Sequence, residues 1–444
     1  MTALTNNTRS FASGEAASPK KPLPGYQACL INRSEGLASV LNFSRLFFLK
    51  DLLLARKTDR MNSCRVARQF LYVLLALPLA GCRPHDFPQY PPNYREYAYV
   101  TNGGSNTVTV LDVVNVRLDR ELPVGQNPVA VAVSPVRDEV YVVNSGGTGG
   151  QGSISVIDSE NNTVVGTIFV HKQPVSIDLD SEGRLAYIAN SGSNTISVVD
   201  LAARREVAAI GAGENPVQAR IAPNGKTVVV ANRGGNSVTL IDSQSRRVRA
   251  FFEGCPGASD VATLPDSSKA FIACSEGHQV MVIALAHPDA HVSSDRLETL
   301  MDVGRAPVQL ALKPDGGEIF VSNSQSNSIS EIDTSKDDVG GAYMMGDNPV
   351  HGLVSSDNSL LYVGNLRSQE VTIYAIDDGK RAGYIRVGDG PSAMAFSSTG
   401  NLLFVVDARS GDVAVVRTAS HSLFTMLPAG RSPNAIAIKS FKLP

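Results

Sequence analysis

Apolar and polar residues alternate along short segments of this chain, and the alternation recurs about every 42 residues. In the first clear copy, residues 97–102 are followed by a Gly-Gly-Ser turn and then by residues 107–112. Such alternation is typical of a strand with one buried face. Short, closely spaced strands with a period near 42 residues are the pattern of a propeller blade. The sequence therefore predicts an all-β propeller of four-stranded antiparallel blades.

Each repeat contains four strand signals, which we name a to d. Strand a follows a Gly-x-x-Pro turn, strand b ends in Asn and strand c ends in Asp. Strand a begins at Pro128, Pro174, Pro216, Pro256, Pro307, Pro349, Pro391 and Pro433. Strand b ends at Asn102, Asn144, Asn190, Asn232, Cys274, Asn323, Asn365 and Asp407. Strand c ends at Asp112, Asp158, Asp200, Asp242, Ala284, Asp333, Asp377 and Arg417. Short polar side chains at strand ends stabilise turns, so we interpret the repeated Asn and Asp as structural.

The order of the strands predicts how the ring closes. The chain enters at a strand b (97–102) and ends with an isolated strand a (433–438). Pairing of the last strand with the first b, c and d strands hides two sheet edges and gives eight blades. Seven blades is the alternative, because Pro256 and Pro307 are 51 residues apart, against 42 in the later repeats. The extra residues include His287 and His291, and no spacing supports a metal site there.

Residues 61–81 have the pattern of a secretory signal peptide. Arg65 and Arg68 precede an apolar core that is too short to be a stable membrane-spanning helix. The following Leu79-Ala80-Gly81-Cys82 resembles the bacterial lipobox, which implies cleavage before Cys82 and lipidation of this residue. A short core helix that ends in Cys is the alternative. Residues 1–60 are then an extension upstream of a true start at Met61, or a long leader.

Residues 82–96 are predicted to be the lipidated Cys and a Pro-rich tether, and residues 97–444 the propeller. Pro88, Pro91 and Pro92 favour extended backbone. By resemblance to Gram-negative lipoproteins, Arg rather than Asp at position 83 implies sorting to the outer membrane. We therefore expect an exported protein that is lipid-anchored at the periplasmic face of the outer membrane.

Removal of the leader makes the charge balance more acidic. The whole chain has 40 basic and 42 acidic residues, of which residues 82–444 keep 29 and 38. An acidic domain lacks the positive field of a general nucleic-acid surface. We expect a monomer that meets an envelope protein or a small ligand and has no general nucleic-acid binding.

Only Cys255 and Cys274 remain in the propeller once the leader and Cys82 are set aside. In an oxidising compartment, an even pair at strand ends on one side of a repeat predicts a disulfide, with two buried thiols as the alternative. A haem-attachment CxxCH, a phosphate loop, a nucleophile elbow and zinc-ligand spacing are all lacking from the sequence. We therefore predict no cofactor and no metal.

The repeated phrases resemble the YVTN-repeat β-propeller family of exported bacterial and archaeal proteins, over residues 97–441. The resemblance implies the fold but no single function. Related propellers include binding or surface proteins, a lactonase group and the haem-binding propeller of periplasmic nitrite reductase, and a shared fold does not choose among them.

Departures from the repeat mark a first candidate site on strand a, which lies nearest the axis. Its second and fourth positions after Pro are small in some repeats, as at Ala130 and Ala132, and polar in others. The polar set is Ser176, Asp178, Gln218, Arg220, Gln309 and His351. This set predicts a ligand-binding funnel in the central channel. The alternative is a hydrated channel with an internal Asp178–Arg220 pair. Asp178 and His351 belong to opposite blades, so we expect no hydrolytic dyad.

The d–a and b–c loops open on one face and carry a second set of candidates. These are His171, Lys172, Arg233, His278, Arg305, Arg367, Arg409 and Arg431. They are either solvated surface or a site for an anionic ligand or protein partner. The favoured function is a non-catalytic binding scaffold. The alternatives are an enzyme of the lactonase or oxidoreductase kind and a binder of haem or another planar cofactor.

Overall fold

The computed structural model describes residues 90–147, 149–286 and 294–442. The chain divides into two compact units, residues 1–85 and 86–444, and all described residues belong to the second. The signal segment 61–81, Cys82, His287 and His291 lie outside the described residues. Within the described ranges, none of the structure is a helix with the length and apolarity needed to span a bilayer.

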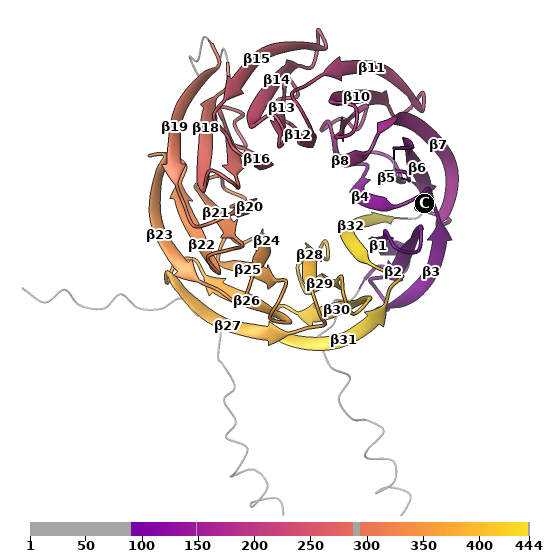
Figure 1. Cartoon of the computed structure of the whole chain (residues 1–444). Helices are drawn as coiled ribbons and strands as arrows, with labels where there is room; N and C mark the ends of the chain where they lie inside the picture. Colours follow the sequence, from indigo (N-terminus) through magenta and orange to yellow (C-terminus); the bar gives the residue numbers. More distant parts are fainter. Residues whose placement is uncertain (1–89, 148, 287–293, 443–444) are drawn as a thin grey trace, which may run out of the picture. The chain divides into compact units, whose positions relative to one another are not determined.

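Eight antiparallel sheets of four strands each form the ring in Figure 1. Strand a is innermost: β4 (Pro128–Val133), β8 (Pro174–Leu179), β12 (Pro216–Ile221), β16 (Ala258–Thr263), β20 (Pro307–Leu312), β24 (Pro349–Val354), β28 (Pro391–Phe396) and β32 (Pro433–Lys442). Strand b is β1 (Tyr94–Asn102), β5 (Glu139–Asn144), β9 (Leu185–Asn190), β13 (Thr227–Asn232), β17 (Lys269–Cys274), β21 (Glu318–Asn323), β25 (Leu360–Asn365) and β29 (Leu402–Asp407). The eight-blade prediction is confirmed.

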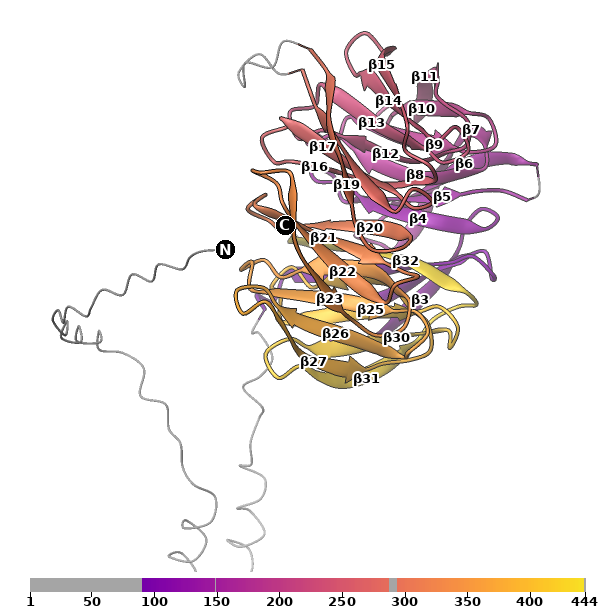
Figure 2. The same ribbon diagram turned by 60° about the vertical axis from the view of Figure 1, so that its left-hand side comes forward.

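The two outer strands of each blade continue the same order. Strand c is β2 (Thr107–Asp112), β6 (Gln151–Asp158), β10 (Thr195–Asp200), β14 (Ser237–Asp242), β18 (Gln279–Ala284), β22 (Ser328–Asp333), β26 (Glu370–Ala375) and β30 (Asp412–Arg417). Strand d is β3 (Arg117–Pro123), β7 (Thr163–Lys172), β11 (Arg205–Gly211), β15 (Arg247–Glu253), β19 (Arg296–Asp302), β23 (Asp338–Met344), β27 (Lys380–Arg386) and β31 (Ser422–Pro428). Figure 2 turns the ring so that the outer strands β19, β23 and β27 come forward.

We number the blades along the chain. Blade 1 combines β32 with β1, β2 and β3, blade 2 contains β4 to β7, and blade 8 contains β28 to β31. The d–a and b–c connections form one rim of the ring, which we call the loop face. The a–b and c–d connections form the opposite rim, which we call the turn face.

The ring closes where the last strand pairs with the first. β32 is antiparallel to β1, with Tyr99 opposite Ala437 and Val100 opposite Ile436. It continues four residues beyond its predicted end. There the Lys439 ammonium donates to the Ser134 carbonyl at 3.0 Å and lies 3.4 Å from Asp138, which ties blade 1 to blade 2.

The apolar core lies between adjacent blades. Strand residues that alternate inward in sequence pack against the next sheet, as Ile196 and Val198 of blade 3 do against Val228 and Val230 of blade 4. All four of these side chains are fully buried. Burial of this apolar surface between sheets is the main term that holds neighbouring blades together.

The repeated Asn lies inside its own blade. The Asn102 amide donates to Thr109 at 2.9 Å, and Asn365 donates to Thr372 at 2.8 Å. The turn glycine three residues before strand a allows this packing, since a Cβ at Gly125 would lie 2.6 Å from the Asn144 amide carbon. In blade 5, Cys255 and Cys274 take these two places and are joined by a disulfide.

Besides β32 and β1, which begins at Tyr94 rather than at residue 97, two strand boundaries differ from the sequence prediction. Strand a of blade 5 begins at Ala258, two residues after Pro256, because Ala258 pairs with Cys274 as Pro307 pairs with Asn323. Strand c of blade 7 ends at Ala375, so Asp377 belongs to the following turn. In both cases a Pro or Asp near the boundary indicated the wrong residue.

Candidate functional site

The polar residues predicted on strand a occupy one arc of the inner ring. Asp178 lies on β8, Arg220 on β12, Gln309 on β20 and His351 on β24, in blades 3, 4, 6 and 7. Three of the other four inner strands, β28, β32 and β4, carry alanines at the matching positions, namely Ala393, Ala395, Ala435, Ala437, Ala130 and Ala132. The axis is therefore lined by a polar arc and an alanine arc.

Asp178 meets the next blade through both carboxylate oxygens. Oδ2 accepts a hydrogen bond from the Ile221 amide at 2.9 Å, and Oδ1 lies 3.6 Å from the Arg220 guanidinium. Burial raises the pKa of Asp178, while the charge of Arg220 acts in the opposite direction. Asp178 and Arg220 are thus the ion pair that the hydrated-channel interpretation describes.

Gln218 is joined to a residue that the sequence prediction missed. The Gln218 amide donates to Asp260 Oδ1 at 3.2 Å, and the Leu310 backbone N–H donates to Asp260 Oδ2 at 2.9 Å. Asp260 is 9% exposed, and burial raises its pKa. The signal was available in the sequence, because Asp260 is an acidic residue at the fourth position after Pro256, one of the two positions that gave the candidates in the other repeats.

Gln309 links two inner strands through hydrogen bonds of its side-chain amide. Its Oε1 accepts from the Gly352 amide at 2.8 Å, and its Nε2 donates to the Gly352 carbonyl at 3.3 Å. Asp178, Asp260 and Gln309 therefore share one role. Each satisfies backbone groups on the free edge of the strand a that follows it, which would otherwise lack a sheet partner.

His351 keeps an unused ring nitrogen on the other side of the axis. Its Nδ1 is buried and has no hydrogen-bond partner within the described residues. Burial, with the positive charge of Arg220 as a second cause, lowers the pKa of His351 to about 4. The imidazole is neutral at pH 7 and is not paired with Asp178, in agreement with their position in opposite blades.

Arg220 is the positive charge that influences the ionisable side chains near the axis. It acts electrostatically on Asp178, Asp260 and His351, and its side chain is 43% exposed, so solvent reaches it. Asp178 and Asp260 oppose it with two carboxyl groups. Of the predicted funnel, Arg220 is partly exposed, and Gln218 Oε1 and His351 Nδ1 take part in no hydrogen bond within the described residues.

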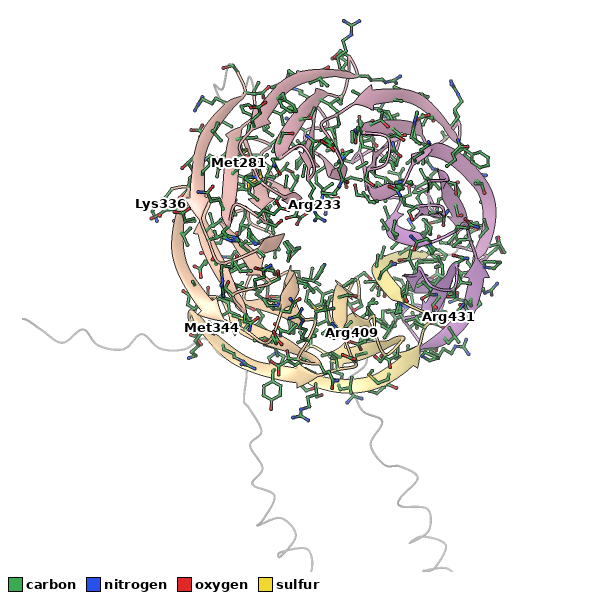
Figure 3. The ribbon with its side chains drawn as sticks, viewed as in Figure 1. Arg233, Met281, Lys336, Met344, Arg409 and Arg431 are labelled. Atoms are coloured by element: carbon green, nitrogen blue, oxygen red, sulfur yellow. A yellow bond between two sulfur atoms is a disulfide. The ribbon has the colours of Figure 1, made fainter. Side chains whose placement is uncertain are left out.

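The loop face contains a recess beside the axis. A cavity of about 540 Å³ is lined by Arg233 of blade 4, Glu276 and His278 of blade 5, and Gln325 of blade 6. The His278 ring accepts the Ala306 amide at 3.2 Å, which fixes the ring. Arg233 is exposed, and its guanidinium has no ion pair within the described residues. Figure 3 shows Arg233 at the inner rim of the ring, while Lys336 and Met344 lie on its outer circumference.

The other cations of the loop face are spread around the ring and mixed with acids. Arg409 donates to the Leu366 carbonyl at 3.0 Å and lies 3.4 Å from Asp389. His171 lies 3.5 Å from Glu206. Glu214 and Asp347 occupy the same d–a loops that elsewhere carry Arg305 and Arg431. This face is a mixed-charge surface rather than a basic patch.

Metal-ligating side chains are not gathered in this part of the molecule. The described ranges hold no group of three or more His, Cys, Asp or Glu placed to bind one ion. His287 and His291 belong to residues outside those ranges.

The fold and the sequence together identify the family. The profile of the YNCE-like beta-propeller family matches residues 181–439. The chain belongs to this family. The eight blades and the repeated phrases of this YNCE-like propeller also agree with its resemblance to YVTN-repeat proteins. No curated protein matches the chain.

Several solved structures share the fold of this YNCE-like propeller. Dihydro-heme d1 dehydrogenase NirN is 16% identical, covers 80% of this chain and 77% of its own, and gives a TM-score of 0.65. AztD from Citrobacter koseri is 12% identical, with 79% and 99% covered and a TM-score of 0.60. A protein from Bacteroides uniformis, proposed as a 6-phosphogluconolactonase, is 15% identical, with 78% and 100% covered and a TM-score of 0.55. At these identities the similarity concerns the fold alone.

Proposed function

We propose that this protein is a lipid-anchored propeller of the cell envelope that binds a partner or ligand through its loop face and the adjoining mouth of the central channel. The observation that carries the proposal is the recess lined by Arg233, Glu276 and His278, where an exposed guanidinium forms no ion pair within the described residues. A recess of about 540 Å³ is within the range of ligand and anchor pockets. An unpaired Arg beside it is a group that interfaces commonly use.

Binding is favoured over catalysis because most polar groups near the axis are already engaged. Asp178, Asp260 and Gln309 accept hydrogen bonds from backbone amides of the next blade. A general acid or base needs a free atom within reach of the substrate. His351 Nδ1 has no hydrogen-bond partner among the described residues, but this atom is buried.

The route of the chain into the propeller supports an orientation with the loop face free. Tyr94, at the start of β1, contacts the Ser398 hydroxyl at 2.6 Å and donates to Glu96 at 2.9 Å, on the turn face. The Tyr90 ring stacks on Tyr94 at 4.9 Å. Cys82 precedes Tyr90 by eight residues, a span of at most about 28 Å. A lipid on Cys82 would therefore hold the turn face near the outer membrane.

The partner is an envelope protein with mixed charge or a small ligand with an acidic group. The loop face alternates Arg with Asp and Glu, which suits complementary pairing with a protein better than binding to a uniform polyanion. The acidic balance of residues 82–444 agrees with this choice.

Site-specific crosslinking tests the proposed surface. A photo-crosslinking residue at Gln325 should capture a defined partner in the envelope, and Arg233→Glu should reduce that product about tenfold or more, since a reversed charge at a contact costs several kcal/mol. Lys226→Glu is the matched control, because it makes the same charge change on the turn face of the same blade. Equal loss in both variants, or no product, would contradict the proposal.

The anchor has its own test. Cells fed a labelled fatty acid should label the wild-type protein and not Cys82→Ser, and the variant should leave the membrane fraction. Met61→Leu should abolish the lipidated form if translation begins at Met61. Labelling of Cys82→Ser would show that the lipid is elsewhere.

The alternative of a hydrolase or oxidoreductase rests on the free Nδ1 of His351. Turnover in a panel of lactones that disappears in His351→Asn and Arg220→Met would favour it. Turnover that survives both changes would place the chemistry away from the axis.

A further inference from the structure

A groove on the turn face, between blades 7 and 8, is separate from the loop face and the axis. It has a volume of about 350 Å³. Its walls are the a–b turns 355–359 and 397–401, and its floor includes Leu360, Tyr362 and Phe396. This volume is at the lower end of the range for small-molecule sites.

The groove is open because the turn of blade 7 lacks a proline. Where blade 5 has Pro265, the ring lies 2.8 Å from the ideal Cβ position of Gly316 in blade 6, so the two turns touch. Pro135 approaches Gly183 of blade 3 to 3.2 Å in the same way. In blade 7 this position is Ser356, and its hydroxyl is 3.9 Å from the corresponding point at Gly400. The smaller side chain leaves a gap lined by hydroxyl groups.

The floor carries an aromatic pair. Tyr362 packs edge-to-face on Phe396 at 5.5 Å, and burial and the nearby Asp357 charge, rather than a hydrogen bond, raise the pKa of its hydroxyl. Two of the matching tyrosines elsewhere have a hydrogen-bond partner, since Tyr99 donates to Asn162 at 2.6 Å and Tyr141 donates to Glu139 at 2.5 Å. Tyr362 lines the groove although it is only 1% exposed, so its phenolic hydroxyl would meet a ligand only at the floor.

The rim adds acceptors and donors but no positive charge. Asp357 lines the groove and accepts through Oδ1 from the Ser355 hydroxyl at 2.5 Å and the Ser359 hydroxyl at 2.8 Å, while its Oδ2 has no hydrogen-bond partner in the described chain. Hydrogen bonds from Ser355 and Ser359 lower the pKa of Asp357, so the carboxylate is ionised at pH 7. Neither Lys nor Arg lines the groove. These features disfavour an anionic ligand and favour one with several hydroxyl groups.

We propose that this groove binds a neutral saccharide ring, with an apolar C–H face on Phe396 and hydroxyl groups paired with Tyr362, Asp357 and Ser356. A sugar ring has hydroxyl groups that donate and accept hydrogen bonds and an apolar C–H face. The groove matches them with a carboxylate, several hydroxyl groups and an aromatic wall. The volume fits one ring. The proposal does not depend on the loop-face function.

Saturation-transfer NMR on the full chain, in a detergent without a sugar headgroup, tests this site. The probes are glucose, galactose, mannose and N-acetylglucosamine, with glucose 6-phosphate as the anionic comparison. We expect at least one neutral sugar to receive saturation and to bind more tightly than glucose 6-phosphate. Transfer to none of the neutral sugars, or preference for the phosphate, would overturn the proposal.

Two variants locate the binding. Ser356→Pro introduces the residue that blades 2, 4, 5 and 6 carry at this position and should weaken binding about tenfold or more by filling the groove. Ser181→Pro makes the same change in the turn of blade 3 and should leave binding unchanged. Equal affinity in Ser356→Pro and the wild type would rule out this groove.

Tyr362→Phe keeps the test decisive if Ser356→Pro does not fold. Phe occupies the same position in blades 5, 6 and 8, as Phe271, Phe320 and Phe404, so the fold accepts it. Loss of one hydrogen bond should weaken sugar binding about three- to tenfold. Unchanged affinity, with an unchanged circular dichroism spectrum, would contradict the proposed contact.

Discussion

Asp407 is the residue whose protonation most affects its own blade. It ends strand b of blade 8, where six other blades have Asn, and it is fully buried. Burial, together with the charge of neighbouring Asp412, raises the pKa of Asp407 to about 8. Its Oδ2 accepts from the Gly388 amide at 2.9 Å. The protonated carboxyl reproduces the shape and neutral charge of the Asn in the other blades.

The substitution Asp407→Asn should remove a pH dependence of stability. Because the folded pKa is above the unfolded value, the stability linked to this proton is present at acidic pH and is lost as the pH rises toward 8 and above. We expect the variant to exceed the wild type by roughly 1 to 3 kcal/mol at pH 9 and to differ little at pH 4. Urea unfolding at both pH values measures this, and parallel pH profiles would contradict it.

His351 should titrate far below an ordinary histidine. Its pKa of about 4 follows from burial first and from Arg220 second. Because the folded pKa is depressed, the related stability is complete above the unfolded pKa and is lost as the pH falls toward 4. In Arg220→Met the His351 ring should titrate at higher pH, as followed by NMR of its ring protons. An unchanged titration would mean that Arg220 has no influence on this ring.

The sequence identified the axis residues and the Asp178–Arg220 pair but not the backbone partners of these side chains. Alternation on strand a was sufficient to select Asp178, Gln309 and His351 as inward positions. Asp178 and Gln309 bond instead to backbone groups of the next blade, which depends on the stagger between sheets and leaves no trace in one repeat. The isolation of His351 from Asp178 followed from blade counting alone.

At the scale of the element, the first and last residues of a strand were predictable where particular side chains mark them. A Pro at the first position and an Asn at the last bound β4 and β5 as expected. Blade 5 broke both rules at once, since Ala258 starts β16 and Cys274 ends β17. The disulfide there replaces a set of three residues. Blades 1, 2, 4, 6 and 7 combine a turn Gly, an Asn and a hydroxyl on strand c, and blade 5 has Cys255, Cys274 and Met281.

This replacement predicts how blade 5 responds to loss of its disulfide. Cys255→Ser with Cys274→Ser should destabilise the fold by about 3 kcal/mol, the value for closing a loop of this length. Cys255→Gly with Cys274→Asn should recover little, because Met281 offers the buried Asn amide no hydroxyl (Figure 3).

Addition of Met281→Thr to that double variant should restore about 1 kcal/mol through a hydrogen bond like that between Asn102 and Thr109. Chemical unfolding of the three variants under oxidising conditions measures the series. If the added Thr gave no gain, the set in blade 5 would not be equivalent to those in the other blades.

At the scale of the whole molecule, the ring was predictable from chain order and the groove was not. A first strand of type b and a last strand of type a leave one way to pair both edges. The groove between blades 7 and 8 depends on whether two turns from different repeats touch, and Ser356 shows this only once Gly400 is known to face it. The sequence of one repeat does not predict which residues of a neighbouring repeat it contacts.

Closure also determines how the ring fails. Deletion of residues 432–444 removes β32 and leaves the inner edge of β1 unpaired along Tyr94–Asn102. An exposed, apolar strand edge is a template for pairing with another chain. We expect the thermal midpoint to fall by roughly 10 °C or more and the protein to self-associate, as measured by calorimetry and size-exclusion chromatography. Deletion of residues 443–444 alone keeps β32 and should have little effect. A truncated chain that stayed monomeric with an unchanged midpoint would show that the seven continuous blades hold the ring without the closing strand.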